Sequence, residues 1–126
     1  MGEVIRRGTV ADVAAITALT RSAYAKWVPL ISREPLPMRA DYSAAIKDHR
    51  FDLLFVDSDL AALIETVLRD GDLLIENVAV APSFQKRGFG RLLIAHAEQM
   101  AAQAGRAYVV STQTHALKRT YVSMPL

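Results

Sequence analysis

The chain has 126 residues, of which 52% are apolar and none is cysteine. This length and apolar content fit one small domain with one core, and the lack of cysteine excludes disulfides, thiolate metal sites and a cysteine nucleophile. The net charge is only +2, so no nucleic-acid partner is expected. The N-terminus lacks the apolar run of a secretory signal, and no segment approaches the length of a membrane span, which predicts a cytoplasmic protein.

The first 50 residues predict a strand followed by two helices. Residues 3–8 alternate enough for a strand, and Thr9 with Asp12 resembles a capping box, so a helix should begin there. Prolines between 29 and 37 bracket a loop, and residues 38–50 then predict a short second helix. Apolar positions of the first helix recur at helical spacing and form one face: Val13, Ile16, Thr20, Ala23 and Trp27.

The middle of the chain predicts antiparallel sheet. Residues 52–57 and 60–68 are apolar runs separated by Asp57-Ser58-Asp59, a sequence typical of a turn between antiparallel strands. A second turn at 69–72 leads into the strand 73–80. Its near-continuous apolar character predicts burial on both faces.

Two acids, Glu65 and Glu76, interrupt these apolar strands. A carboxylate there costs free energy unless it is paired or solvated, so each should face a polar cleft, a partner or solvent. His49 and His96 are isolated in the sequence, and a surface or packing role is favoured for His96. Asn77 fits either orientation of a water or a structural role in the strand, and the structural role is favoured. No catalytic triad or metal-binding group emerges, so no metal is expected.

The strand 73–80 leads into the most informative segment, a basic glycine loop. Pro82 ends the strand, and an amphipathic helix is predicted over 90–104 with Gly105 as its left-handed cap. Gly88 and Gly90 lack side chains that would keep an anion from the backbone, so the amides of 87–91 can surround one at the helix N-terminus. The positive charge there comes from Lys86, Arg87 and Arg91.

Two common phosphate-binding motifs are excluded for this loop. A dinucleotide fingerprint needs a third glycine where Leu93 stands, and a P-loop needs Gly-Lys-Ser/Thr. A glycine-rich turn with solvated basic residues and no ligand is the alternative interpretation of the loop alone.

The loop contains the run Gln85-Lys86-Arg87-Gly88-Phe89-Gly90, with Val78-Ala79-Val80-x-Pro82 before it and an Ala/Leu-rich helix after it. This segment resembles the acetyl-CoA signature of the GNAT N-acetyltransferase superfamily, Gln/Arg-x-x-Gly-x-Gly/Ala. The resemblance implies an α/β fold with a mixed, mostly antiparallel sheet flanked by helices, whose signature strand splays from its neighbour. Acetyl-CoA would be the co-substrate. The strand would bond the pantetheine arm and the loop its phosphates, through Val78, Ala79, Val80, Gln85, Lys86, Arg87, Gly88, Phe89, Gly90 and Arg91.

Acetylation of an amine needs a neutral nucleophile, and therefore a base that accepts its proton. Glu76 precedes the implied splay and is the best candidate, because a raised carboxyl pKa in a partly dry cleft would suit the task. Pairing of Glu76 with a Lys or Arg is the alternative, and Glu65 is a poorer candidate. Tyr121 resembles the tyrosine that protonates the departing thiolate of CoA in the family.

The resemblance fails after a short strand predicted at 106–111. The family continues with Arg-Leu-Tyr-Thr-Asn, a helix and two more strands, so we expect a core over 1–111 that lacks the last two strands and an atypical tail over 112–126. Synonymous codons for residues 109–114 permit Arg-Leu-Tyr-Thr-Asn in a shifted frame. A frameshift is therefore a hypothesis that the coding DNA tests, and it would make the likeness of Tyr121 accidental.

These observations favour an N-acetyltransferase that acetylates a primary amine, on a small molecule or a peptide, by direct attack on acetyl-CoA. Loss of the C-terminal strands would instead favour a non-catalytic CoA-binding module, and a structural domain whose loop binds nothing is the third possibility. An uncovered strand edge can pair with another chain, so a homodimer is plausible.

Overall fold

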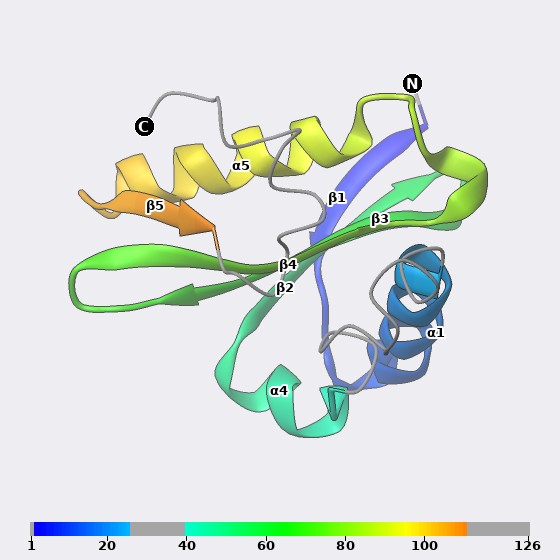
Figure 1. The fold of residues 1–126 in the computed structure, drawn as a ribbon, viewed down its shortest axis with the longest axis horizontal. Coiled ribbons are helices and arrows are strands. Elements are labelled where there is room, and N and C mark those ends of the chain that lie inside the picture. Colours follow the sequence, from blue (N-terminus) through cyan, green and yellow to red (C-terminus); the bar gives the residue numbers. More distant parts are fainter. Residues whose placement is uncertain (1, 26–39, 111–126) are drawn as a thin grey trace.

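The computed structural model describes residues 2–25 and 40–110. Its centre is a five-stranded sheet in the order β1-β2-β3-β4-β5 (Figure 1). Neighbouring strands are antiparallel except β4 and β5, which are parallel. The mixed, mostly antiparallel sheet is therefore confirmed. Its strands are β1 (Glu3–Arg7), β2 (Arg50–Val56), β3 (Asp59–Leu68), β4 (Asp72–Val80) and β5 (Ala107–Val110).

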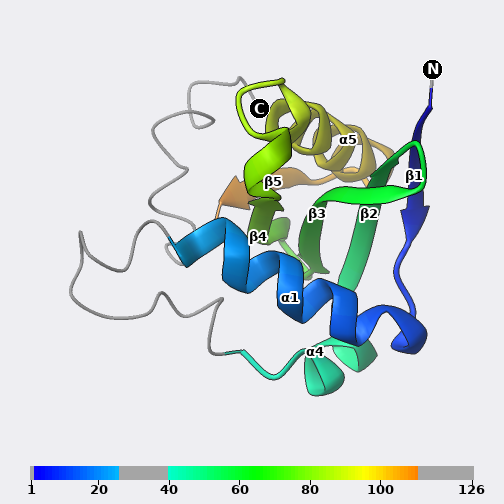
Figure 2. The ribbon, with the colours of Figure 1, turned by 90° about the vertical axis from the view of Figure 1, so that its right-hand side faces the viewer.

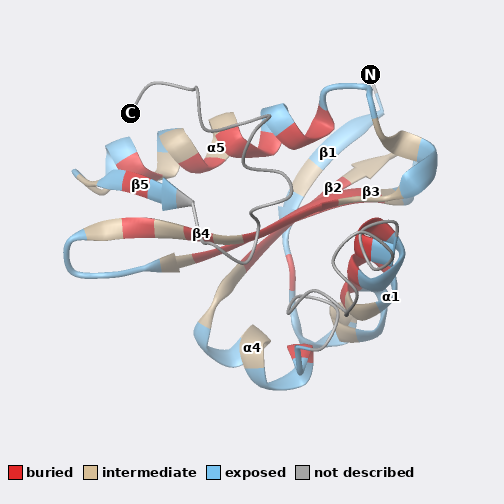
Figure 3. Ribbon diagram, in the orientation of Figure 1, coloured by how far each residue is buried: buried red, intermediate tan, exposed pale blue. Residues whose placement is uncertain are grey.

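Helices cover both faces of the sheet (Figure 2). α1 (Val13–Tyr24) and α4 (Tyr42–Asp48) lie on one face, and α5 (Phe89–Gln103) lies on the other. Burial is concentrated in the central strands and on the sheet-facing sides of the helices (Figure 3). The core under α5 includes Ile64, Ile75, Val78, Phe89 and Leu93. The core under α1 and α4 includes Ile16, Tyr24, Tyr42, Leu63 and Ala79.

The predicted capping box is confirmed at the start of the first helical segment. The Asp12 carboxylate accepts a hydrogen bond of 2.8 Å from the Thr9 backbone N–H and forms an ion pair of 2.8 Å with Arg6. A 3₁₀ turn over Val10–Asp12 precedes α1. The predicted apolar face of α1 is buried at Ile16, Thr20 and Ala23, whereas Trp27 lies outside the described residues.

The second helix is shorter than the predicted 38–50. Asp41 caps it, because its side chain accepts a hydrogen bond of 3.0 Å from the Ser43 N–H. His49 ends it in an extended conformation, and Arg50 already belongs to β2. Residues 38–50 contain no proline or glycine that would mark the end of a helix, so the sequence alone predicts one helix over the whole segment.

The predicted turns are confirmed. Asp57 and Ser58 have positive φ values of 49° and 77°, as a tight two-residue connection between β2 and β3 requires. Gly105 has φ +71° just after α5 and acts as the predicted left-handed cap. The predictions for the tail 112–126, the missing last strands and Tyr121 lie outside the described residues. No helix of the described part of the chain is long and apolar enough to cross a membrane.

Asp12→Asn is expected to lower the free energy of unfolding by about 1 kcal/mol at neutral pH, because it weakens the cap. The bond from Arg6 lowers the pKa of Asp12 from 3.8 to about 2. A lowered carboxyl pKa stabilises the fold above 3.8, and this contribution is lost as the pH falls towards 2. Urea unfolding between pH 6 and pH 2 should show a shallower acid dependence in Asp12→Asn, whereas the exposed control Asp70→Asn should follow the wild type. Equal acid dependence in both variants would contradict the assignment.

Candidate functional site

β4 carries a β-bulge at Glu76. Glu65 of β3 stands opposite Asn77 and Thr66 stands opposite Ile75, so Glu76 is the extra residue on β4. β5 pairs with β4 only from Asp72 to Ile75 within the described residues. From the bulge onwards, β4 is therefore paired with β3 alone over this part of the chain.

The bulge determines where the backbone groups of the next residues point. The Tyr24 hydroxyl donates a bond of 3.1 Å to the Val78 carbonyl, and the Gln85 side-chain amide donates one of 3.0 Å to the Val80 carbonyl. Ala81 instead donates its N–H to Ala61 of β3 at 2.8 Å. Backbone groups of successive strand residues point to alternate edges. The N–H groups of Val78 and Val80 thus lie along the edge of β4 that faces away from β3.

Two tyrosines fix the bulge from the side of α1 and α4. Asn77 is only 1% exposed. Its Oδ1 accepts a bond of 2.8 Å from the Tyr24 hydroxyl, and its Nδ2 donates one of 3.3 Å to the Tyr42 hydroxyl. Burial raises the pKa of Tyr24, so its hydroxyl remains a donor throughout the neutral range. These bonds give Asn77 the structural role that the sequence favoured.

The glycine loop contains backbone donors that no described acceptor takes up, on the exposed residues 86–88 and on the buried residues Phe89 and Gly90. Lys86 and Gly88 have positive φ values of 66° and 84°, and Gly88 directly precedes α5. The first helical bond runs from the Leu92 N–H to the Gly88 carbonyl at 3.0 Å. Within residues 2–25 and 40–110, the amides of 86–91 have no protein acceptor. Such a concentration of amides at a helix N-terminus suits an anion.

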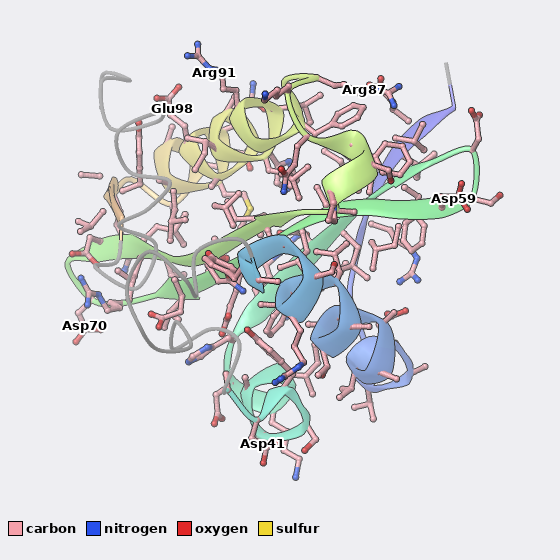
Figure 4. All side chains as sticks on the ribbon, turned by 45° about the vertical axis from the view of Figure 1, so that its right-hand side comes forward. Asp41, Asp59, Asp70, Arg87, Arg91 and Glu98 are labelled. Atoms are coloured by element: carbon pink, nitrogen blue, oxygen red, sulfur yellow. The ribbon has the colours of Figure 1, made fainter. Side chains whose placement is uncertain are left out.

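The basic side chains of the loop are exposed, and one of them is held by aromatic rings. The Arg87 guanidinium lies 5.2 Å from the centre of the Phe84 ring and 5.3 Å from that of Phe89. Figure 4 shows Arg87 beside the loop and Arg91 on the outer side of the first turn of α5. Phe89 itself is buried in the core under α5, so its side chain is not available to a ligand.

A buried carboxylate and a histidine form a pair that sequence analysis did not foresee. Glu65 is 4% exposed, and its Oε2 lies 2.6 Å from Nδ1 of His49. Burial raises the pKa of Glu65 and the bond to His49 opposes this rise. His49 is therefore not isolated. His96 is also close to an acid, since its Nε2 lies 3.6 Å from Oδ2 of buried Asp52.

Glu76 is half-buried at the bulge and forms no salt bridge among the described residues. Its charge contributes to the raised pKa values of Glu65, Tyr24 and Tyr42. The bulge thus places Glu76 in a region where negative charge and buried hydroxyl groups accumulate. In the described part of the chain, no group of three His, Cys, Asp or Glu is arranged to hold a metal.

The model of the Acetyltransferase (GNAT) family matches residues 15–121. The chain belongs to this family. Acetyl-CoA is the co-substrate of GNAT enzymes, and the family and fold are those of an acetyltransferase. The resemblance inferred from the loop sequence is therefore confirmed.

Solved GNAT structures share the fold at low sequence identity. The PaiA N-acetyltransferase of Thermoplasma acidophilum in complex with coenzyme A is 19% identical with a TM-score of 0.76, covering 98% of this chain and 89% of that one. A GCN5-related N-acetyltransferase from Ralstonia eutropha is 17% identical with a TM-score of 0.73, covering 99% and 92%. An aminoglycoside acetyltransferase from an uncultured soil metagenomic sample, in complex with sisomicin, is 16% identical with a TM-score of 0.66, covering 98% and 88%. A search of curated proteins finds no match.

The residues that the sequence predicts to bind acetyl-CoA follow one another along the chain, from the end of β4 to the start of α5. The edge of β4 at Val78 and Val80 leads through a 3₁₀ turn, Pro82–Phe84, into the loop, and Glu76 lies at the other end of this edge. Tyr121, the expected general acid, lies outside the described residues. The pair of His49 and Glu65 has no local sequence signal, because its members are 16 residues apart in different elements.

Tyr24→Phe is expected to lower the free energy of unfolding by about 1–3 kcal/mol, because it leaves two buried acceptors, on Asn77 and Val78, without their donor. Urea unfolding measures this loss. Ser22→Ala removes, from an exposed residue of the same helix, a hydroxyl that bonds only to the Leu19 carbonyl of its own turn, and should change stability by less than about 0.5 kcal/mol. Equal stability of Tyr24→Phe and Ser22→Ala would show that the tyrosine does not hold the bulge.

Proposed function

We propose that the chain transfers the acetyl group of acetyl-CoA to a primary amine by direct attack of the amine on the thioester. One observation carries this proposal: backbone N–H groups without a strand partner in the described part of the chain lie along the edge of β4 at Val78 and Val80, and a second group of backbone N–H donors follows in the loop around Gly88. An extended polar arm that ends in a diphosphate matches this arrangement, because the strand edge offers ladder-type bonds and the loop offers amides for an anion.

The residues proposed to hold acetyl-CoA divide into two groups. Val78 and Val80 offer main-chain bonds to the pantetheine arm. Ala79 lies between them, directs its backbone groups to β3 and packs its methyl group in the core under α1. The loop then receives the diphosphate through Gln85, Lys86, Arg87, Gly88, Phe89, Gly90 and Arg91. Gln85 serves chiefly by tying the loop to the Val80 carbonyl, because its side-chain amide is already committed there.

Glu76 is proposed as the base that takes a proton from the acceptor. The lack of a salt bridge within the described ranges leaves its carboxylate able to accept one. The negative charge of Glu65 and Glu76 near the bulge favours a cationic acceptor, as an alkyl ammonium ion is at neutral pH. Small-molecule and peptide amines both meet this requirement. Tyr121 remains the predicted donor of a proton to the CoA thiolate.

Two measurements in sequence test this proposal. Calorimetric titration with acetyl-CoA should show binding to one site, which a purely structural domain would not. Release of CoA with a panel of polyamines, aminoglycosides, arylalkylamines and peptides with free N-termini should then show turnover with at least one amine. Binding without turnover on any amine would favour the non-catalytic CoA-binding module instead.

Gly88→Ala is expected to weaken acetyl-CoA binding roughly tenfold, because an L-residue in the left-handed region costs about 1–2 kcal/mol. An added Cβ at Gly88 meets no heavy atom within 4 Å, so the effect comes from backbone conformation and not from a clash. Calorimetry measures the affinity. Gly71→Ala is the matched control, since Gly71 has equally open surroundings and no positive φ. Unchanged affinity in Gly88→Ala would contradict the role of the loop.

Glu76→Gln is expected to lower kcat by roughly 100-fold or more while the dissociation constant of acetyl-CoA stays within about twofold, because a carboxamide cannot accept the proton. Steady-state kinetics with the best amine of the panel and calorimetry measure the two quantities. Glu98→Gln, on α5 (Figure 4), is the control and should keep the wild-type kcat. A Glu76→Gln enzyme with normal kcat would exclude Glu76 as the base.

A further inference from the structure

We propose that Glu65 and His49 form the route by which the proton taken from the acceptor leaves the site for solvent. This inference rests on the proposed acetyl transfer to an amine, and it assigns a task to two residues that the acetyl-CoA signature does not include. Both residues act on the acceptor only through Glu76, so they are relay residues.

The pair begins beside the bulge. Glu65 stands opposite Asn77 in the register of β3 and β4, next to the extra residue Glu76. The charge of Glu76 acts on Glu65 and contributes to the rise in its pKa. The groups that face Glu65 are Tyr24 from α1, Tyr42 from α4, Glu76 and Asn77 from β4, and His49. Among the described residues, only His49 joins Glu65 through an imidazole, a group with two nitrogens that can each carry a proton.

The His49 end of the pair lies in a groove that the region proposed for acetyl-CoA does not line. The side chain of His49 is 31% exposed. It lines a groove of about 560 Å³ between α4 and the C-terminal end of α5, together with Arg7, Lys47, Asp48, Arg50 and Met100. The lining of this groove includes no residue of the β4 segment 76–80 or of the glycine loop. A proton that reaches His49 can therefore leave without crossing the region proposed for acetyl-CoA.

The chemistry of the two groups suits such a transfer. Burial raises the pKa of Glu65, so this carboxylate takes up a proton more readily than an exposed glutamate. The hydrogen bond of 2.6 Å joins it to Nδ1 of His49. An imidazole that accepts a proton on one nitrogen can release one from the other. His49 thus joins a buried carboxylate to a partly exposed imidazole, and proton exchange with solvent or a flip of the ring returns His49 to its starting tautomer after each transfer.

The overall reaction requires one proton to leave. The acceptor arrives as R–NH3+, and the products are R–NH–CO–CH3 and the thiol of CoA. One of the two protons lost by nitrogen ends on the thiolate sulfur as the carbon–sulfur bond breaks and the carbon–nitrogen bond forms. The other is accepted by Glu76 and must reach solvent before the next turnover. Transfer of this proton to Glu65, directly or through a water molecule, and then to His49 returns Glu76 to its carboxylate form.

The same hydrogen bond would be present if His49 and Glu65 only stabilised the fold. The test therefore needs a kinetic measurement that a loss of packing would not affect. His96 provides a matched control. Its side chain is 28% exposed, and it also lies beside a buried carboxylate, that of Asp52. It lies on α5, however, on the opposite face of the sheet from α4. His49→Gln and His96→Gln therefore each remove a partly exposed imidazole beside a buried carboxylate, but only His49 is hydrogen-bonded to that carboxylate.

The experiment measures kcat, KM for the amine and the dissociation constant of acetyl-CoA for the wild type, His49→Gln, Glu65→Gln and His96→Gln, with imidazole added in increasing concentration. His49→Gln should lower kcat roughly tenfold or more, leave acetyl-CoA affinity within twofold, and regain activity as imidazole is added. Glu65→Gln should lower kcat without regaining it. His96→Gln and the wild type should not respond to imidazole.

A normal kcat in His49→Gln would overturn the inference and leave the proposed function intact. A lowered kcat that imidazole does not restore, or an equal loss in His96→Gln, would assign the pair a structural role and overturn the inference as well. A wild-type chain that binds acetyl-CoA but turns over no amine would contradict the proposed function itself, and the inference would fall with it.

Discussion

The extra residue in β4 is the constraint on which the arrangement of the site depends. Without the bulge at Glu76, the register between β3 and β4 would continue unbroken, and each residue after it would face the opposite side of the sheet. Val78 would then leave the core under α5, and Asn77 would leave the tyrosines. The bulge is held because Asn77 is fully buried with its amide bonded on both sides, to Tyr24 and to Tyr42. Two helices and one strand thus share a polar contact, and an apolar residue at Asn77 alone would leave the two tyrosine hydroxyls without this partner.

The loop after β4 adds a second constraint of a different kind. Gly88 must adopt a left-handed conformation just before α5, and Lys86 does so as well despite its side chain. Two contacts limit the movement of this loop: Gln85 binds the Val80 carbonyl, and Arg87 packs on Phe84 and Phe89. The amides between these contacts are arranged before any ligand arrives, which lowers the entropic cost of binding an anion.

Much of this architecture follows from local sequence. The strands, their turns, the capping box of Thr9 and Asp12 and the glycine loop depend on residues close together in the chain, and each was predicted. The contacts that complete the site are not local. Tyr24 and Asn77 are 53 residues apart, and His49 and Glu65 are 16 apart. A bulge also has no sequence signature here, because the β-branched and apolar residues around Glu76 fit a regular strand equally well.

The most direct test of the account is a crystal structure of the chain with CoA. The account predicts that the diphosphate oxygens lie within about 3.2 Å of the backbone amides of residues 86–91, with the pantetheine arm along the edge of β4 at Val78 and Val80. A diphosphate bound elsewhere, or loop amides turned into the protein and bonded to it, would contradict the central claim that this strand edge and loop form the acetyl-CoA site.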